Sequence, residues 1–274
     1  MKNLRITIAS SILLVAASCK TAQPNATINP NLPAYQHLEN SGKIYAAFYQ
    51  QRAAEYQALC LQAYNIAKLR LDEALLQKTD KPLAIVSDID ETFLDNSYYA
   101  VQQVKAGKFY DQKTWEEWTA KGSATPLMGA QEFYNYAASK GVQVLYITNR
   151  MQTERDGTLK NLRQYNFPIQ DENHLILRTN ESSKENRRKD IEKNYNIVLL
   201  LGDSLGDFSS DFDKKSETDR SKAVVTNERE FGKKFIVLPN VGYGDWESSF
   251  YQYKHAYPEN VKDSLMYNAV KSAP

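Results

Sequence analysis

A short apolar run that ends in two aspartates constrains the fold of this chain more than any other stretch. Leu83 to Val86 follow Pro82 and lead through Ser87 into Asp88 and Asp90. An apolar run of this length after a helix breaker is typical of a buried strand. In open parallel sheets, ligands bind beyond the carboxyl ends of the strands. The two aspartates therefore lie where a site is expected.

The spacing of Asp88 and Asp90 also has a chemical meaning. Two carboxylates so close together repel each other, and a cation or a shared proton would relieve that repulsion. A Mg²⁺ ion takes oxygen ligands from one or two carboxylates and from a substrate phosphate. The first aspartate could then attack phosphorus while the second handles the proton of the leaving group. A solvated acidic turn explains the same two residues, so other segments have to decide.

Three segments further along the chain carry polar side chains at the ends of predicted elements. They are Thr148, Asn149 and Arg150 after the apolar run 142–147, Lys184 at the start of the predicted helix 183–194, and Asp203 and Asp207 after the apolar run 197–201. Taken singly, each has an ordinary explanation, because a threonine can begin a turn and lysines on helices are usually solvated. Chance does not readily produce the set in this order.

Apolar runs and helical patterns alternate along the chain after Pro82. The predicted strands are 83–86, 142–147, 175–177, 197–201 and 234–238, and the predicted helices between them are 130–140, 153–165 and 183–194. Strands that alternate with helices favour a parallel sheet with helices on both faces. The chain is therefore placed in the α/β class, with a Rossmann-like core.

Two regions lie outside this alternation. A helical pattern runs from Gly42 to Leu76, as one helix or two, with Tyr45, Tyr49, Tyr56, Leu59, Ala63 and Ala67 on one predicted stripe. Cys60 in this pattern is interpreted as a small buried apolar residue. The run of mixed charge 211–222 is interpreted as a solvated excursion.

The motif residues support a family resemblance. Asp88-Ile89-Asp90-Glu91-Thr92 resembles motif I of the haloacid dehalogenase (HAD) superfamily. Extended through Asn96, the stretch is similar to the class C acid phosphatases, bacterial lipoproteins that hydrolyse phosphomonoesters. Thr148, Lys184 and the stretch 203–207 match the three later motifs in the same order. The resemblance implies a HAD core with a small, mainly helical cap inserted around residues 97–125.

The same resemblance implies a role for each matched residue. Asp88 would be the nucleophile and form an aspartyl phosphate, and Asp90 would be the acid and base. Thr148 and Lys184 would bind the phosphate. A Mg²⁺ cofactor would be held by Asp88, the backbone carbonyl of Asp90 and Asp203, with Asp207 in support. Asn149 and Arg150 are predicted to contact the substrate. Ser204 stands where the family usually has Asn or Thr, which predicts a retuned metal site.

Aromatic residues are dense in the predicted cap. Tyr99, Trp115 and Trp118 lie there, and Tyr243 lies in a Gly-rich loop near the C-terminal end. By resemblance, Trp115 and Tyr243 stand where the family is thought to grip a nucleobase, with Tyr99 and Trp118 as weaker candidates. The substrate is then a small phosphorylated molecule, a nucleoside monophosphate above all, as in a 5'-nucleotidase. A cap that merely packs its own small core explains the same aromatic residues.

The N-terminus has the pattern of an export signal. Lys2 and Arg5 precede an apolar core too short to span a bilayer, and small residues precede Cys19. The pattern resembles a bacterial lipoprotein signal over residues 1–18, with lipid on Cys19, a tether over 19–36 and the phosphatase domain over 37–274. The predicted location is the outer membrane, on its periplasmic or surface face. A plain secretory signal with an incidental cysteine is the alternative.

Charge and the remaining residues limit the other function classes. The formal net charge is +1, and loss of residues 1–18 removes two positive charges, which leaves −1. This balance argues against binding to a nucleic-acid polymer. The three histidines have no metal-ligand spacing. A non-catalytic storage or binding protein on the same fold, a haem-binding surface lipoprotein and a homodimer are left open.

Overall fold

The computed structural model describes residues 38–272. These residues belong to one unit that extends over residues 34–274. The predicted signal segment, Cys19 and the tether lie outside the described residues. None of the described helices combines the length and the apolar character needed to cross a membrane.

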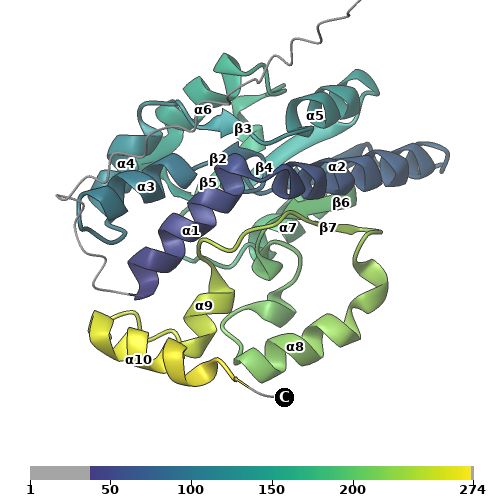
Figure 1. The fold of residues 1–274 in the computed structure, drawn as a ribbon. Helices are drawn as coiled ribbons and strands as arrows, with labels where there is room; N and C mark the ends of the chain where they lie inside the picture. The colour runs from purple at the N-terminus through teal and green to yellow at the C-terminus, as the bar shows by residue number, and fades with distance from the viewer. Residues whose placement is uncertain (1–37, 273–274) are drawn as a thin grey trace, which may run out of the picture. The chain divides into compact units, whose positions relative to one another are not determined.

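A five-stranded parallel sheet forms the centre of the described unit (Figure 1). Its strands, in spatial order, are β5 (Leu175–Arg178), β4 (Gln143–Met151), β1 (Leu83–Ser87), β6 (Asn196–Gly202) and β7 (Phe235–Val237). All four neighbouring pairs are parallel. The α/β class is therefore confirmed. Because β1 lies between β4 and β6, the loops that follow these three strands meet at one edge of the sheet.

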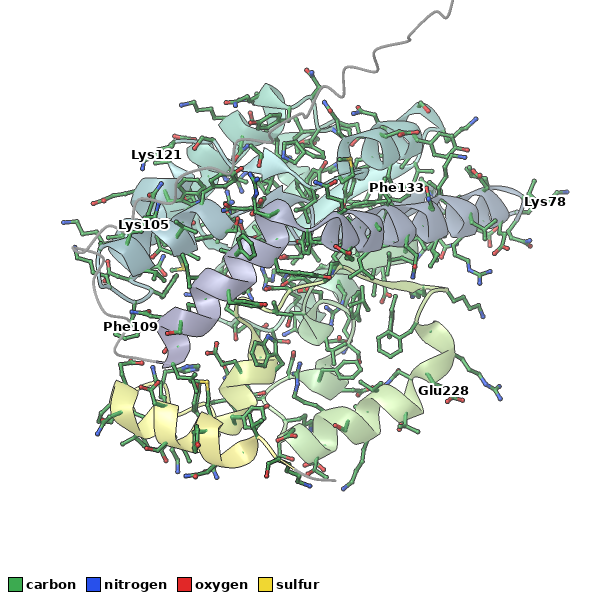
Figure 2. The ribbon with its side chains drawn as sticks, viewed as in Figure 1. Lys78, Lys105, Phe109, Lys121, Phe133 and Glu228 are labelled. Carbon is green, nitrogen blue, oxygen red and sulfur yellow. The ribbon has the colours of Figure 1, made fainter. Side chains whose placement is uncertain are left out.

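Alternation along β1 builds a core on each face of the sheet. Ala84 and Val86 pack with Ile191 on one face, whereas Ile85 packs with Leu71 on the other. Helices cover both faces, with α2 (Ala54–Leu75), α5 (Ala130–Ser139) and α6 (Arg155–Gln164) on one side and α7 (Glu185–Glu192) on the other. Phe133 of α5, labelled in Figure 2, is a buried member of the larger core.

The long N-terminal helical pattern is two helices. α1 (Leu38–Arg52) and α2 are separated at Ala53, whose backbone is extended. The buried stripe of α2 contains Tyr56, Cys60, Ala63, Tyr64, Ala67 and Leu71. The predicted stripe was wrong in part, because Tyr45 and Leu59 are exposed. The break at Ala53 lets α1 leave the direction of α2, so one helical phase does not extend across both.

The cap follows β1 directly. It comprises α3 (Ser97–Lys105) and α4 (Gln112–Thr119), and a short antiparallel pair, β2 (Leu94–Asp95) with β3 (Thr125–Pro126), closes its base. The side chain of Asp111 accepts a hydrogen bond from the Thr114 N–H at 3.0 Å and so caps α4. The sequence did not predict the β2–β3 pair, since two residues on each side are too short for a periodic pattern.

The charged run 211–222 is not simply solvated. Four short one-turn helices occur between α5 and α8 (Glu217–Thr226). They are η1 (Gln152–Glu154), η2 (Glu172–His174), η3 (Leu205–Asp207) and η4 (Ser210–Phe212). Most residues of that run are exposed, but Phe212 and Arg220 are buried within it, so its interpretation as a solvated excursion was wrong in part. A further one-turn helix, η5 (Glu228–Glu230), precedes β7, and α9 (Asp245–Phe250) and α10 (Glu259–Ala269) follow it.

Candidate active site

The loops after β1 and β6 bring acidic and hydroxyl side chains together. The Asp88 N–H donates to the Leu201 carbonyl at 2.9 Å, which extends the pairing of β1 with β6 by one residue. The Thr92 hydroxyl lies 3.3 Å from Asp88 Oδ2 and 3.2 Å from Asp203 Oδ1. The predicted nucleophile and the predicted metal ligand of the last motif are therefore joined by one side chain of the first motif.

Three carboxylates form a cluster at this edge. Asp88, Asp203 and Asp207 each place one oxygen within 4.8 Å of the others. Lys184 forms ion pairs with Asp88 and with Asp207, the second at 2.7 Å. Asp207 Oδ2 also accepts the Ser204 N–H at 3.0 Å. The structure thus brings together four of the predicted residues, and it gives Asp207 a direct place beside the other two carboxylates.

Burial places this cluster under electrostatic strain. Burial raises the pKa of Asp88 to about 7; Lys184 opposes that rise, and the charges of Asp207 and Asp90 add to it. Burial and the neighbouring Asp207 and Asp88 raise the pKa of Asp203 well above its usual value. Burial lowers the pKa of Lys184, but Asp207 and Asp88 outweigh it, so that pKa lies above the usual value. One lysine thus faces three carboxylates, and this donor set of hard oxygens fits a divalent cation such as Mg²⁺.

The Asp90 carboxylate lies apart from this cluster. It forms an ion pair with Arg150, from Nη2 to Oδ1 at 2.6 Å, and it accepts a hydrogen bond from Asn96 Nδ2 at 2.9 Å. Among the described residues, the cluster of possible metal ligands does not include this carboxylate. The two aspartates of the first motif therefore have different partners, as their different predicted roles require.

Thr148 and Arg150 lie inside β4, which extends to Met151. Both side chains are buried, whereas Asn149 between them is exposed, as expected for alternation along a strand. The side chain of Arg150 is only 1% exposed. The prediction that Arg150 contacts the substrate does not fit this position, because all three guanidinium nitrogens already donate to Asp90 or to Thr158.

Arg187 of α7 connects two of the predicted motifs. Its Nη1 donates to the Thr148 carbonyl at 2.7 Å, and its Nη2 donates to Asn149 Oδ1 at 2.8 Å and to the Ser183 carbonyl at 3.2 Å. The next residue, Arg188, donates through Nη1 to the Asp207 carbonyl at 2.8 Å. One turn of α7 thus connects the strand that carries the threonine with the segments that carry the lysine and the last aspartate.

The aromatic residues of the cap divide into two groups. Tyr99 is buried and its hydroxyl contacts Thr114 at 3.0 Å, while Trp118 is buried and donates through Nε1 to Asn96 Oδ1 at 2.8 Å. These two rings belong to the packed cap, so their prediction as base-binding residues does not fit. Trp115 is half-buried, packs edge-on against Tyr99, and lies with its ring centroid 5.9 Å from the guanidinium carbon of Arg150.

Tyr243 reaches the first motif from the C-terminal loop. The residue is 40% exposed, yet its hydroxyl donates to the buried carboxylate of Glu91. Burial raises the pKa of Glu91 well above its usual value, and Asp90 adds to the rise. Glu91 has a φ of 54°, a conformation that is uncommon for residues other than glycine. The loop that carries Tyr243 is therefore fixed beside the first motif.

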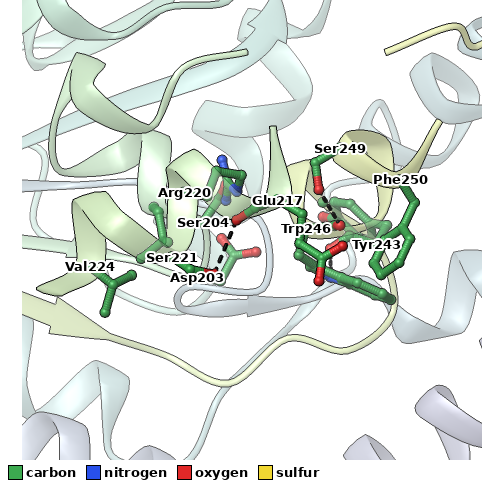
Figure 3. Close-up of a pocket in the computed structure, with 12 residues that line it drawn as sticks. Asp203, Ser204, Glu217, Arg220, Ser221, Val224, Tyr243, Trp246, Ser249 and Phe250 are labelled. Carbon is green, nitrogen blue, oxygen red and sulfur yellow. Dashed lines mark hydrogen bonds between the residues drawn. The ribbon is translucent and has the colours of Figure 1, made fainter. Parts of the chain in front are cut away.

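A pocket opens between Asp203 and α8 (Figure 3). Its volume is about 260 Å³, and its lining includes Asp203, Glu217, Arg220, Tyr243 and Trp246. Asp203 and Tyr243 belong to the site described above, so the pocket is continuous with that site. It provides room next to the carboxylate cluster on the side of the C-terminal loop.

Sequence reasoning missed several residues of the site. Glu91 and Asn96 lay within the quoted first motif but received no role, and Arg187 lay within the third. Asn240, whose Nδ2 donates to Asp203 Oδ2 at 2.7 Å, lay in the quoted C-terminal loop. The available signal was their place in loops that follow strands or in the first turn of a helix. Such a signal identifies a neighbourhood but does not identify a partner.

Comparisons with known proteins identify the family. The family described as "HAD superfamily, subfamily IIIB (Acid phosphatase)" matches residues 3–246. The solved class C acid phosphatase from Bacillus anthracis is 40% identical, with a TM-score of 0.83 over 86% of this chain and 99% of that chain. A structure of that protein with tungstate bound is 41% identical, with the same TM-score and the same coverage of both chains.

Curated relatives are more distant. Vegetative storage protein 2 of Arabidopsis thaliana is 28% identical over 181 residues, which are 62% of this chain and 66% of the relative. Acid phosphatase 1 of Solanum lycopersicum is 27% identical over 130 residues, which are 44% of this chain and 50% of the relative. The chain thus spans less than two thirds of the length of these two relatives.

Proposed function

The chain belongs to the acid phosphatases of the HAD superfamily, subfamily IIIB, which are phosphomonoester hydrolases, and on that basis we propose its mechanism, cofactor and substrate class. The proposal is hydrolysis of nucleoside monophosphates through an aspartyl phosphate, with Mg²⁺ as cofactor. One observation carries it. Asp88 lies at the end of the central strand, paired with Lys184 and grouped with Asp203 and Asp207.

In this mechanism Asp88 attacks phosphorus and the bond to the leaving oxygen breaks. Asp90 gives its proton to that oxygen, and then takes a proton from the water that hydrolyses the aspartyl phosphate. Thr148 and Lys184 bind the phosphate oxygens through a hydroxyl and a positive charge that are already in position, which stabilises the charge of the transition state. The Asp90 carboxylate lies apart from the cluster of possible metal ligands. It is therefore available for proton transfer, because its oxygens are not needed to bind the metal.

The metal proposal rests on the donor set. Asp88, the backbone carbonyl of Asp90 and Asp203 would hold Mg²⁺, with Asp207 in support. When bound, the ion supplies positive charge against the phosphate and the nucleophile. The raised pKa values of Asp88 and Asp203 support this assignment, because they report carboxylates whose charge is incompletely balanced.

The nucleotide proposal rests on aromatic surface near Asp90. Arg150 pairs with the Asp90 carboxylate and its guanidinium carbon lies 5.9 Å from the centroid of the Trp115 ring, so this aromatic surface is near the proposed acid. Tyr243 is held beside the same motif through Glu91. Aromatic side chains bind nucleobases by stacking, with little dependence on the base.

One experiment tests the phosphatase mechanism. Wild-type protein should release phosphate from nucleotides and sugar phosphates with Mg²⁺ and should lose this activity with EDTA. Asp88→Asn should lower the rate by roughly 10³-fold or more, since an amide cannot replace the nucleophile. The matched control is Asp190→Asn on the exposed side of α7, which should keep full activity. Near-normal phosphate release from pure Asp88→Asn protein would falsify the mechanism.

We also propose that Cys19 carries lipid and anchors the exported protein at the outer membrane. The basic start, the apolar core and the small residues before Cys19 support this proposal. Two or more acyl chains hold a protein on a membrane far more firmly than one. Labelled fatty acid should enter the wild-type protein and not Cys19→Ser. Equal labelling of the two would remove the anchor.

A further inference from the structure

The Asp90 carboxylate is gripped by a buried arginine, which the mechanism above leaves without a role. We propose that Arg150 is a positioning residue that aims the Asp90 carboxylate at the leaving-group oxygen, and that it does not bind the substrate phosphate. This inference rests on the proposed function, because it needs Asp90 to act as the acid.

The contact between the two side chains is a fork. Arg150 Nη2 donates to Asp90 Oδ1 at 2.6 Å, and Nε donates to Oδ2 at 3.1 Å. Such paired bonds fix the plane of a carboxylate as well as its distance. Lysine at this place would supply a charge but no fork. The geometry therefore determines the direction in which Asp90 points.

The guanidinium of Arg150 is itself fixed by a hydrogen bond to α6. Arg150 Nη1 donates to the Thr158 hydroxyl at 3.0 Å, and that hydroxyl donates to the Glu154 carbonyl at 2.7 Å. Thr158 is completely buried at the start of α6. The guanidinium is thus fixed to the core, so its carboxylate partner is held by a rigid element.

The cap provides a second hold on Asp90. Asn96 Nδ2 donates to Asp90 Oδ1 at 2.9 Å, while Asn96 Oδ1 accepts the Trp118 Nε1–H at 2.8 Å. Among the described residues, Oδ1 thus receives bonds from Arg150 Nη2, Arg150 Nε and Asn96, whereas Oδ2 receives a bond from Nε alone. Oδ2 is the less engaged oxygen, and we assign the proton transfer to it.

The place of Arg150 argues against phosphate binding. All three of its guanidinium nitrogens donate to Asp90 or to Thr158, and the Trp115 ring lies over the guanidinium. Lys184 instead pairs with Asp88, and the Arg150 N–H donates to the hydroxyl of Thr148, the other proposed phosphate-binding residue, at 3.1 Å. The end of β4 therefore carries two residues with different tasks. Thr148 binds the phosphate, and Arg150 positions the acid Asp90.

The test compares two substrates that differ in how much they need an acid. 4-Nitrophenol leaves readily without a proton, whereas an alkyl alcohol such as glycerol does not. Positioned acid catalysis contributes about 10²–10⁴-fold. Arg150→Met should therefore lower kcat/KM for glycerol phosphate by about 10- to 100-fold more than for 4-nitrophenyl phosphate. The ratio kcat/KM reports the step in which the leaving group departs, so slow hydrolysis of the aspartyl phosphate does not mask the effect.

Two further variants test the inference if Arg150→Met folds poorly. Thr158→Val removes the hydroxyl that accepts from Arg150 Nη1 and leaves Asp90 itself unchanged. It should also lower kcat/KM more for glycerol phosphate than for 4-nitrophenyl phosphate, by a smaller factor than Arg150→Met. Arg163→Met replaces an exposed arginine on α6 and should change neither substrate. Inhibition by inorganic phosphate should be the same in all variants and in wild type.

Two results would overturn the inference. Equal losses for both substrates with weaker inhibition by phosphate would make Arg150 a phosphate ligand. Equal losses with unchanged inhibition would make it a structural residue only. Hydrolysis of 4-nitrophenyl phosphate by the wild-type protein is measured in the same experiment, so a failure of the proposed function is distinguished from a failure of this inference.

Discussion

At the scale of single residues, the site depends on how few positive charges serve many carboxylates. Lys184 contacts both Asp88 and Asp207, and Arg150 contacts Asp90. All of these side chains are buried or nearly so, and a buried charge that loses its partner is costly. Replacing any one of these residues therefore leaves a buried charge without its partner. Activity and stability should be measured together for every single substitution at this site.

Trp115 provides the residue-scale prediction for substrate choice. Stacking of a base on an aromatic side chain is worth about 1–3 kcal/mol, or roughly 5- to 150-fold in binding. Trp115→Ala should therefore weaken use of a nucleoside monophosphate strongly and use of a small sugar phosphate little, as measured by kcat/KM. If Trp115 is only part of the cap core, both substrates should suffer alike and the Tm should fall. That outcome would remove the nucleotide assignment and leave the phosphatase assignment in place.

The sequence was informative about residues at strand ends and less so about side-chain direction. Asp88, Lys184, Asp203 and Asp207 were identified from their positions at the ends of predicted elements together with the family resemblance, and the structure brings them together. The direction of Arg150 could not be predicted, because the apolar run stops at 147 whereas β4 continues to Met151. Hydrogen bonds to neighbouring strands, which no local pattern reveals, extend this strand through polar residues.

At the scale of elements, the joint between the cap and the core is tight at one glycine. Gly157 of α6 lies against the end of α4, where an added methyl group would overlap the Thr119 carbonyl oxygen and lie 2.7 Å from Ala120 Cα. Both neighbours are backbone and cannot give way as a flexible side chain would. The close approach of the two helices therefore requires glycine.

Gly157→Ala and Gly42→Ala should have opposite effects on stability. Alanine in a helix normally gains about 0.5–1 kcal/mol over glycine. Gly42 lies in α1 with nothing within 4 Å of an added methyl group, so its substitution should raise the Tm. Gly157→Ala should instead lose about 1–3 kcal/mol through overpacking. Thermal unfolding measures both, and a rise in Tm for Gly157→Ala would show that the cap can move away from α6.

The prediction of helices and strands succeeded where apolar runs were long. It failed where an element was very short or was rich in charged residues. The five core strands were predicted to within a few residues, since burial on both faces produces continuous apolar runs. β2, β3 and α8 were not predicted. In α8 the buried side chain is Arg220, whose Nη1 donates to the Phe212 carbonyl at 2.8 Å. A core position occupied by arginine has no hydrophobic signal.

At the scale of the whole molecule, the carboxylate cluster couples stability to pH and to metal. The pKa of Asp88 is raised to about 7 and that of Asp203 is raised as well. A carboxylate with a raised pKa in the folded state makes the folded protein bind more protons than the unfolded chain. Stability from these groups is then lost as the pH rises from the unfolded value of about 4 through the folded value.

With EDTA, the contribution of the cluster should lower the Tm as the pH rises from 5 to 7.5, and Mg²⁺ should restore it. An ion present at 100 times its Kd adds about 2.7 kcal/mol, which corresponds to about 5–10 °C for a domain of this size. The gain from Mg²⁺ should be larger at pH 7.5 than at pH 5, because the cluster carries more charge there. Asp88→Asn is the matched variant and should show less pH dependence. An equal gain at both pH values would contradict the coupling.

The site is assembled from segments that are far apart along the chain. Lys184 and Asp88 are 96 residues apart, Asp203 and Thr92 are 111 apart, and Tyr243 and Glu91 are 152 apart. Contacts of such long range form late in folding, because the intervening chain must first be ordered. Helices such as α2 and α5 can form from local contacts well before that. Enzymatic activity is consequently a stricter reporter of completed folding for this chain than helix content is.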